Sequence, residues 1–168
     1  MVTLQPINLK QPSTGHREAL RNLFNLWHHD LSIMDCTLFP HMDDNGYYEY
    51  TATDVYFDSD DTVRDKLLAY FIRYNNELAG FCIISKPPYI LKQDCDYCVG
   101  EFYITGNFRR KGVAGDACRL IFAKHPGRYC LETIENNTAA KRFWTKLINS
   151  VGTNILIERD GTLFSFTV

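Results

Sequence analysis

A turn rich in glycine and arginine, set between an apolar segment and a segment with helical spacing, constrains this fold more than any other feature. The apolar segment covers 98–104, the turn 105–112 and the helical segment 113–124, which predicts a strand, a loop and a helix in that order. Gly112 can adopt a positive φ, and Ala114 leaves the first helical turn uncluttered. Since the start of a helix presents free backbone N–H groups, the arrangement favours binding of an anion.

Positive charge surrounds this loop. The segment from Arg109 to Arg128 holds six basic residues and one acidic residue, a net charge of +5. The three basic residues nearest the turn are Arg109, Arg110 and Lys111. The Gly-x4-Gly-Lys-Ser/Thr pattern of nucleotide hydrolases is absent, and no Gly-x-Gly spacing supports a dinucleotide fold. We therefore expect a diphosphate in this loop, with a solvated surface turn as the alternative.

The remaining elements follow from hydrophobic periodicity and turn residues. Strands are expected at 4–9, 66–74, 78–85 and 128–134, helices at 16–32 and 137–149, and a closing hairpin at 153–168. The segment 39–62 lacks a sustained period and contains Asp44-Asn45-Gly46, so we expect a long ordered loop with at most one short helix.

Composition limits the class of protein. The 168 residues, 45% of them hydrophobic, suffice for one core and are too few for two ordinary domains, so a single domain over 1–168 is expected. A net charge of −2 argues against nucleic acid or a membrane surface as a partner. No apolar run is long enough to span a membrane, the N-terminus has no export signal, and three of the six cysteines lie in apolar stretches. A cytoplasmic location is expected.

Two motifs resemble those of a known family. The stretch Glu101-Phe-Tyr-Ile-Thr-Gly-Asn-Phe-Arg-Arg-Lys-Gly-Val-Ala114 resembles the signature of the GNAT family of acyl-CoA-dependent N-acetyltransferases, whose loop has the form Gln/Arg-x-x-Gly-x-Gly/Ala. Arg109, Gly112 and Ala114 occupy its fixed positions. Asn137-Thr-Ala-Ala-Lys-Arg-Phe-Trp144 resembles the second signature, Asn-x-x-Ala-x-x-Phe/Leu-Tyr. Further similarities are to a sparsely characterised bacterial subgroup of predicted acetyltransferases.

The resemblance implies a mixed α/β fold. A central, mostly antiparallel sheet of about seven strands would contain one splayed parallel pair, formed by the strands at 98–104 and 128–134. About four helices would flank the sheet. The pantetheine arm of the cosubstrate would lie in the opening of the pair, hydrogen-bonded like an added strand.

The resemblance also implies acetyl-CoA as cosubstrate and assigns residues to it. Backbone N–H groups of the loop would bind its pyrophosphate: Arg110, Lys111, Gly112, Val113 and Ala114. Backbone groups of Phe102, Tyr103 and Ile104 would hold the pantetheine arm, which Phe143 and Trp144 would border. Asn137 would bond pantetheine, although Asn is also a favoured helix N-cap, and one residue can do both.

Glu101 is the candidate general base, eight residues before Arg109, where many family members place an acidic residue. A base is needed because an alkylammonium of pKa ~10 has no lone pair for attack at neutral pH. Alternation along the strand places Glu101 and Tyr103 on one face. The alternative is that Glu101 only pairs with a cation. Trp144 replaces the tyrosine that protonates the CoA thiolate in many relatives, so Tyr103 or water would take that role.

The acceptor is expected to be a primary amine of a cationic small molecule or peptide. The segment 41–65 has a net charge of −7, and in this fold it would border the acceptor. Residues considered for acceptor binding are Trp27, His28, Asp43, Asp44, Tyr47 and Tyr48. The alternative for this segment is solvated surface. A homodimer is the one protein partner considered.

Two other functions stay open at this stage. Trp144 suggests an acyl-CoA-binding module or sensor that has lost turnover. Cys95-Asp-Tyr-Cys98 has the spacing of a zinc or redox pair that Cys36 with His41, or His28 with His29, could complete, which suggests a metal-bound interaction protein. We expect no metal, since no second Cys-x-x-Cys or His-x3-His is present.

Overall fold

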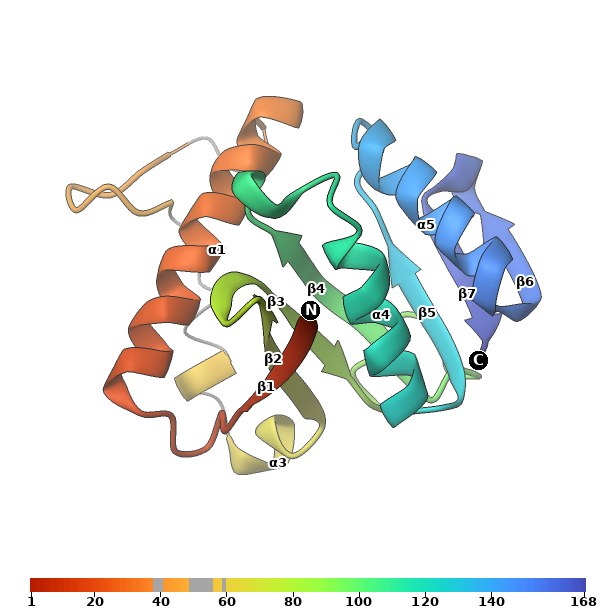
Figure 1. The fold of residues 1–168 in the computed structure, drawn as a ribbon, viewed down its shortest axis with the longest axis horizontal. Helices are drawn as coiled ribbons and strands as arrows, with labels where there is room; N and C mark the ends of the chain where they lie inside the picture. The colour runs from red at the N-terminus through yellow and green to blue at the C-terminus, as the bar shows by residue number, and fades with distance from the viewer. Residues whose placement is uncertain (38–40, 49–55, 59) are drawn as a thin grey trace.

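A seven-stranded sheet in the order β1-β2-β3-β4-β5-β7-β6 organises the protein. The computed structural model describes residues 1–37, 41–48, 56–58 and 60–168 (Figure 1). The elements are β1 (Val2–Ile7), α1 (Thr14–Met34), α3 (Asp61–Arg64), β2 (Leu67–Tyr74), β3 (Glu77–Ser85), β4 (Tyr97–Ile104), η1 (Gly106–Phe108), α4 (Val113–Lys124), β5 (Arg128–Glu132), α5 (Thr138–Val151), β6 (Thr153–Glu158), η2 (Arg159–Gly161) and β7 (Leu163–Thr167).

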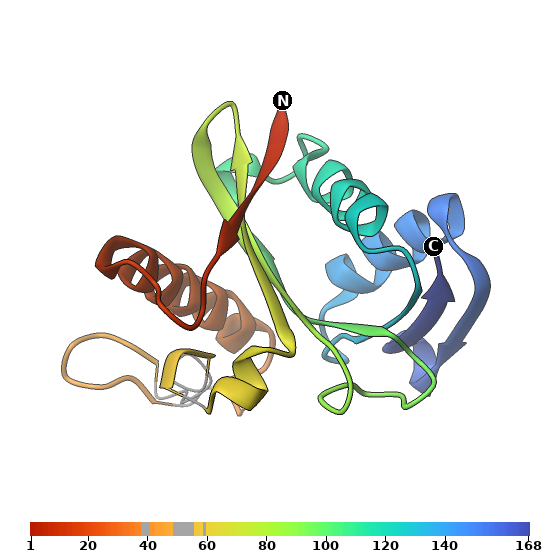
Figure 2. The ribbon, with the colours of Figure 1, turned by 90° about the horizontal axis from the view of Figure 1, so that it is seen from below.

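The strand pairing confirms the expected mixed sheet. β4 and β5 run parallel, and every other neighbouring pair is antiparallel. Figure 2 shows α1 on one face of the sheet and α4 with α5 on the other. Since each face is covered by a helix layer, the sheet buries apolar side chains on both sides.

Two apolar cores result. One packs α1 against the sheet, with Leu20, Phe24 and Phe81 at its centre. The other packs α4 and α5 on the opposite face and contains Ile148 and Phe166. In α1 the buried positions recur at three-and-four spacing, as the sequence predicts. None of the helices in the described part of the chain is long and apolar enough to cross a membrane.

Several boundaries differ from the sequence-based ones. β1 ends at Ile7 rather than at Leu9, because the Asn8 side chain accepts hydrogen bonds from the N–H groups of Lys10 and Gln11 and turns the chain. β5 ends at Glu132, two residues early. In the long loop the described helical residues are 56–58 and α3; residues 38–40, 49–55 and 59 lie outside the described part.

Candidate active site

The parallel strands β4 and β5 separate after a short paired stretch. They pair only from Tyr97 to Val99 on β4. An extra residue, Gly100, then interrupts the ladder with β3, since Ile84 pairs with Val99 and Ile83 with Glu101. Such a bulge bends a strand and increases its twist. Beyond Gly100, β4 is paired to β3 alone, which leaves its other edge facing the opening.

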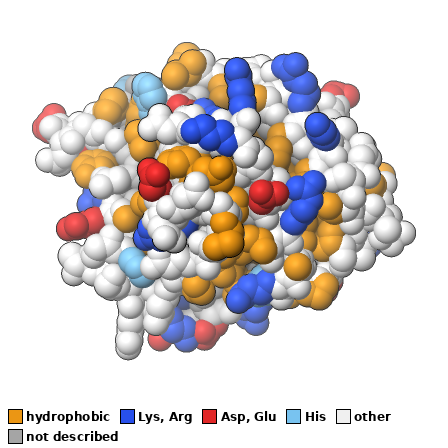
Figure 3. All heavy atoms as spheres, in the orientation of Figure 1, with side chains coloured by type: hydrophobic (Ala, Val, Ile, Leu, Met, Phe, Trp, Pro, Cys, Tyr) orange, Lys and Arg blue, Asp and Glu red, His pale blue; other side chains and the backbone are white. Residues whose placement is uncertain are grey.

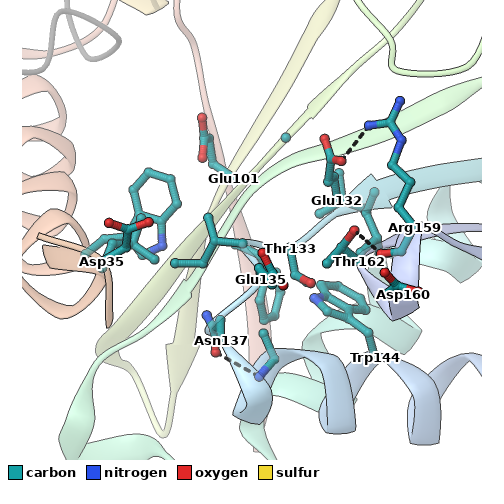
Figure 4. Close-up of a pocket in the computed structure, with 18 residues that line it drawn as sticks. Asp35, Glu101, Glu132, Thr133, Glu135, Asn137, Trp144, Arg159, Asp160 and Thr162 are labelled. Carbon is teal, nitrogen blue, oxygen red and sulfur yellow. Dashed lines mark hydrogen bonds and ion pairs between the residues drawn. The ribbon is translucent and has the colours of Figure 1, made fainter. Parts of the chain in front are cut away.

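A cavity of about 880 Å³ lies at this opening. Its walls come from α1, β4, the end of β5, the start of α5 and η2 (Figure 4). Trp27 and Leu31 line it from α1, Phe102 from β4 and Trp144 from α5. Its polar lining consists of Asp35, Glu101, Glu132, Thr133, Glu135, Asn137, Arg159, Asp160 and Thr162. Ligands of α/β proteins commonly bind at the carboxyl ends of parallel strands, as here.

Glu101 is the most deeply buried carboxylate of the cavity, with 8% of its surface exposed. Burial raises the pKa of Glu101 to about 7, and a hydrogen bond from Tyr56 opposes that rise. The Tyr56 hydroxyl donates to Oε1 at 2.6 Å. A carboxylate that titrates near neutral pH is suited to accept a proton in this range. Tyr56 is a residue that sequence reasoning missed, because it lies 45 residues away in a loop without a pattern.

Three aromatic side chains form one wall. Phe143 stacks on Phe102 with ring centroids 6.1 Å apart, and Trp144 meets Phe102 edge-on at 5.4 Å. Trp144 is buried and lines the cavity, whereas Phe143 contacts both other rings and is outside the lining. Trp144 therefore both packs in the core and borders the cavity.

Asn137 caps α5 and also lines the cavity. Its Oδ1 accepts a hydrogen bond from the N–H of Ala140 at 3.0 Å. A capping residue fixes the start of its helix, so this contact positions the α5 wall. The expected contact of Asn137 with pantetheine stays a prediction.

The loop before α4 has the backbone of an anion site. Arg110 and Gly112 both adopt left-handed conformations, with φ of 60° and 80°, and no atom lies within 4 Å of where a Cβ of residue 112 would be. The first backbone hydrogen bond of α4 runs from Asp116 N to Gly112 O. The N–H groups of Val113, Ala114 and Gly115 precede this bond and so have no acceptor within α4, which leaves donors for an anion at the start of the helix. Figure 3 shows Lys and Arg side chains over the face that carries α4 and α5.

Arg109 does not contribute its charge to this loop as expected. Its Nε donates to the carbonyl of Ile104 at 2.7 Å, its Nη2 pairs with Asp30 of α1, and its guanidinium lies 5.2 Å from the Tyr103 ring. Arg109 therefore fastens the loop to α1. Arg110 and Lys111 are the basic residues of the turn that form no ion pair with a described residue.

Tyr103 lies beside Arg109 rather than in the lining of the cavity. It is buried against Phe81, and burial raises its pKa to about 12. The strand alternation does place it on the α1 face with Glu101, but its hydroxyl is directed to the Arg109–Asp30 pair. A role for Tyr103 in protonating a thiolate has no support in this geometry.

The two helix residues considered for acceptor binding have different positions. Trp27 lines the cavity. His28 is buried among Phe24, Trp27 and Tyr48 and is outside the lining. Burial lowers the pKa of His28 to about 4, so its ring is neutral at physiological pH.

The hairpin at 41–48 lies on α1, and its four candidate residues are outside the cavity lining. The Asp43 carboxylate accepts from the N–H groups of Asn45 and Tyr47 and so holds its own turn. The hydroxyl of Tyr48 is 3.1 Å from both His29 Nδ1 and Ser32 Oγ on α1. Tyr47 contacts α1 as well, and Asp44 is exposed. The acceptor mouth expected at this segment does not coincide with the cavity.

Ion pairs also reduce the field of the acidic segment 41–65. Asp58 pairs with Arg17, Asp61 with Arg64 and Asp65 with Lys10. Two of its acidic residues, Glu49 and Asp54, lie outside the described residues. The paired carboxylates are surface groups: the Asp61 pair lies within α3, whereas the Asp58 and Asp65 pairs join this segment to Arg17 and Lys10.

The Cys-x-x-Cys motif packs within the protein. Cys95 and Cys98 are buried against Cys130 and Ile90. Among the described residues no group of three or more His, Cys, Asp and Glu side chains is arranged to hold a metal ion.

Comparison with known proteins assigns the family. The sequence profile of the acetyltransferase (GNAT) family matches residues 21–148, more than half of the chain. The chain belongs to the GNAT family. No curated protein matches it by sequence.

Solved structures share the GNAT fold. An acetyltransferase from Thermus thermophilus superposes with a TM-score of 0.66 at 16% identity, over 100% of this chain and 96% of that one. A GNAT acetyltransferase from Streptococcus agalactiae gives 0.63 at 13% identity, over 98% and 93%. One from Elizabethkingia anophelis, solved with acetyl-CoA bound, gives 0.51 at 12% identity, over 99% and 97%.

Proposed function

We propose that this GNAT protein transfers the acetyl group of acetyl-CoA to a primary amine, by direct attack while both substrates are bound. The observation that carries the proposal is Glu101, a buried carboxylate with a pKa raised to about 7 in a cavity where β4 leaves β5. Amine acetylation needs a base that works near neutral pH, and this position supplies one.

The cosubstrate has a matching set of backbone donors. The N–H groups from Arg110 to Ala114 would bind the pyrophosphate at the start of α4. The unpaired edge of β4 at Phe102, Tyr103 and Ile104 would take the pantetheine arm as an extra strand. The E. anophelis structure of the same fold contains acetyl-CoA, which supports acetyl-CoA as the cosubstrate.

The reaction balances with these groups. Glu101 takes a proton from the ammonium, directly or through water, and the free amine attacks the thioester carbonyl. A C–N bond forms, the C–S bond breaks, and the amine nitrogen loses its second proton to water as the amide forms. No cysteine is among the described residues that line the cavity, so a covalent acetyl-cysteine intermediate has no thiol there.

The departing thiolate takes its proton from water in this proposal. Trp144 stands where many relatives carry tyrosine, and its indole N–H does not act as an acid. A thiol pKa of ~8.5 makes the thiolate a tolerable leaving group without a strong acid. Turnover is therefore compatible with tryptophan at this position.

Release of CoA tests the function. Purified protein is incubated with acetyl-CoA and a panel of primary amines, and free thiol is measured against reactions without protein. We expect amine-dependent release. Tight binding of acetyl-CoA with no release above background for any amine would favour the alternative, an acyl-CoA-binding module.

Tyr56→Phe should move the pH dependence of turnover. Loss of the hydrogen bond to Oε1 removes a stabilising contact from the ionised carboxylate, so the pKa of Glu101 rises. We expect the ascending limb of kcat/KM to move up by about one pH unit, with rates converging at high pH. A uniform fall at every pH would show instead that Tyr56 only supports the fold.

A further inference from the structure

The wall of the cavity is acidic. Five carboxylates line it, and Arg159 is the single basic residue among the described lining residues. Its Nη1 donates to Glu132 Oε1 at 2.7 Å, so this cation is already paired within the wall. The excess negative charge is carried by Asp35, Glu101, Glu135 and Asp160.

Two of these carboxylates lie on adjacent parts of the rim. Asp35 follows the last residue of α1, and Glu135 belongs to the loop between β5 and α5. The neighbours Asn136 and Met34 touch, with Asn136 Nδ2 donating to the Met34 carbonyl at 3.4 Å. Figure 4 shows Asp35, Glu101 and Glu135 approaching the cavity from three different elements. Three carboxylates around one cavity favour a cationic ligand within it.

Both rim carboxylates have oxygens for a ligand. Thr37 donates its N–H and its hydroxyl to Asp35 Oδ1, and these bonds lower the pKa of Asp35. Asp35 is therefore ionised at neutral pH, and its Oδ2 accepts from no described residue. Glu135 is exposed and forms no ion pair with a described residue.

A third carboxylate marks the inner end of the cavity. Glu101 is more than nine-tenths buried, and its Oε2 accepts no hydrogen bond from the described residues. The amine that reacts must come next to this group. A single acceptor molecule with two amino groups could place one of them at Glu101 and the other, as an ammonium, at the rim.

The wall of α1 between these two ends is apolar. Trp27 and Leu31 are four residues apart on one face of α1, and Asp35 is the extended residue that caps the end of this helix. Four residues of helix rise about 6 Å. An alkyl chain lying along Trp27 and Leu31 would thus connect the inner carboxylate to the acidic rim.

We propose that the acceptor is a diamine or polyamine, with one amine at Glu101, a methylene stem along Leu31 and a second ammonium between Asp35 and Glu135. This inference rests on the acetyl transfer proposed above. It places the cation-binding surface in the cavity rather than on the hairpin at 41–48.

Acceptors that differ only in the far end test the proposal. Butane-1,4-diamine, n-butylamine and 4-aminobutanoate carry a cationic, a neutral and an anionic end on the same stem, and six-carbon analogues control for length. We expect kcat/KM to be about tenfold or more higher for the diamine than for the monoamine, and lowest for the amino acid. Equal values for diamine and monoamine at both lengths would overturn the proposal.

The double variant Asp35→Asn with Glu135→Gln should bring the diamine-to-monoamine ratio close to one. A control pair, Glu18→Gln with Asp116→Asn, removes the same two charges from positions outside the cavity lining and should keep the wild-type ratio. A ratio that survives the Asp35 and Glu135 changes would contradict the assignment of these residues.

The two proposals can fail separately. Acetylation of monoamines without a preference for diamines would remove the inference and leave the acetyl transfer standing. If no amine is acetylated, the transfer fails, and calorimetry of butane-1,4-diamine with CoA-saturated protein decides the inference. Binding that the double variant abolishes would support it, and absent or unchanged binding would overturn it.

Discussion

Glu101→Gln is expected to lower kcat/KM for the best amine by about 10²-fold or more near pH 7 and to leave the affinity for acetyl-CoA nearly unchanged. Glutamine keeps the shape of the side chain but accepts no proton, while the cosubstrate is held by backbone groups of β4 and of the loop before α4. Steady-state kinetics measure the first effect and calorimetry the second. The deficit should shrink as the pH approaches the pKa of the amine.

A matched control separates loss of the base from loss of the fold. Glu77→Gln changes an exposed glutamate at the start of β3 and should retain wild-type kinetics. Undiminished turnover by the Glu101 variant at pH 7 would remove the base from the mechanism.

The same substitution should stabilise the protein at high pH. Because burial raises the pKa of Glu101 from its ordinary 4.5 to about 7, the folded state binds this proton more tightly than the unfolded state. Stability from this group is therefore full below pH 4.5, falls as the pH rises to 7 and stays low above it. At pH 8 the variant should gain up to about 3 kcal/mol, at 1.36 kcal/mol per pKa unit. A Glu101→Gln variant that is more stable but less active than the wild type has lost the base and kept its fold.

Gly112→Glu should weaken acetyl-CoA binding by at least about 2 kcal/mol, roughly 30-fold in Kd. Residue 112 has a φ of 80°, open space beside its Cα and the free N–H groups of α4 next to it. A glutamate would add strain and place a negative side chain where the phosphates approach. Calorimetry with acetyl-CoA is the measurement.

Gly46→Glu is the matched control for that change. Gly46 has a φ of 79° and equally open space, but it lies in the hairpin at 41–48. Gly46→Glu adds the same backbone strain and the same negative charge, but outside the loop before α4. It should therefore leave the affinity for acetyl-CoA unchanged. Equal losses in both variants, or none in either, would contradict the assignment of the pyrophosphate loop. Arg109→Ala should cost less than Gly112→Glu, since its guanidinium is bound to Ile104 and Asp30.

The part of the fold around the loop could be predicted because its signals are local. The predicted helix at 113–124 agrees with α4, and the hairpin of β2 and β3 and the parallel pair were also expected. The helix and the hairpin rest on spacing within one short segment, whereas the parallel pair was implied by the resemblance to the family. Glycine at the turn and asparagine at the start of α5 have backbone reasons that can be read from sequence.

The contacts of the candidate site could not be predicted because they join distant segments. Tyr56 meets Glu101 across 45 residues, and Asn136 meets Met34 across 102. Nothing in the sequence fixes which face of α1 receives the hairpin, so its carboxylates were expected at the acceptor. The turn residues Asp44-Asn45-Gly46 were a signal, available in the sequence, that the Asp43 side chain accepts hydrogen bonds from the backbone of its own turn. The direction of the Arg109 side chain depends on Asp30, 79 residues earlier.

The pH dependence of kcat/KM, measured for wild type and Glu101→Gln at saturating acetyl-CoA, tests the central claim most directly. The claim is that a buried carboxylate at the opening of β4 and β5 takes the proton of an amine. The wild-type profile should contain an ascending limb with a pKa near 7, and the variant should lack that limb and rise only with ionisation of the amine. Two profiles that superpose would contradict the account.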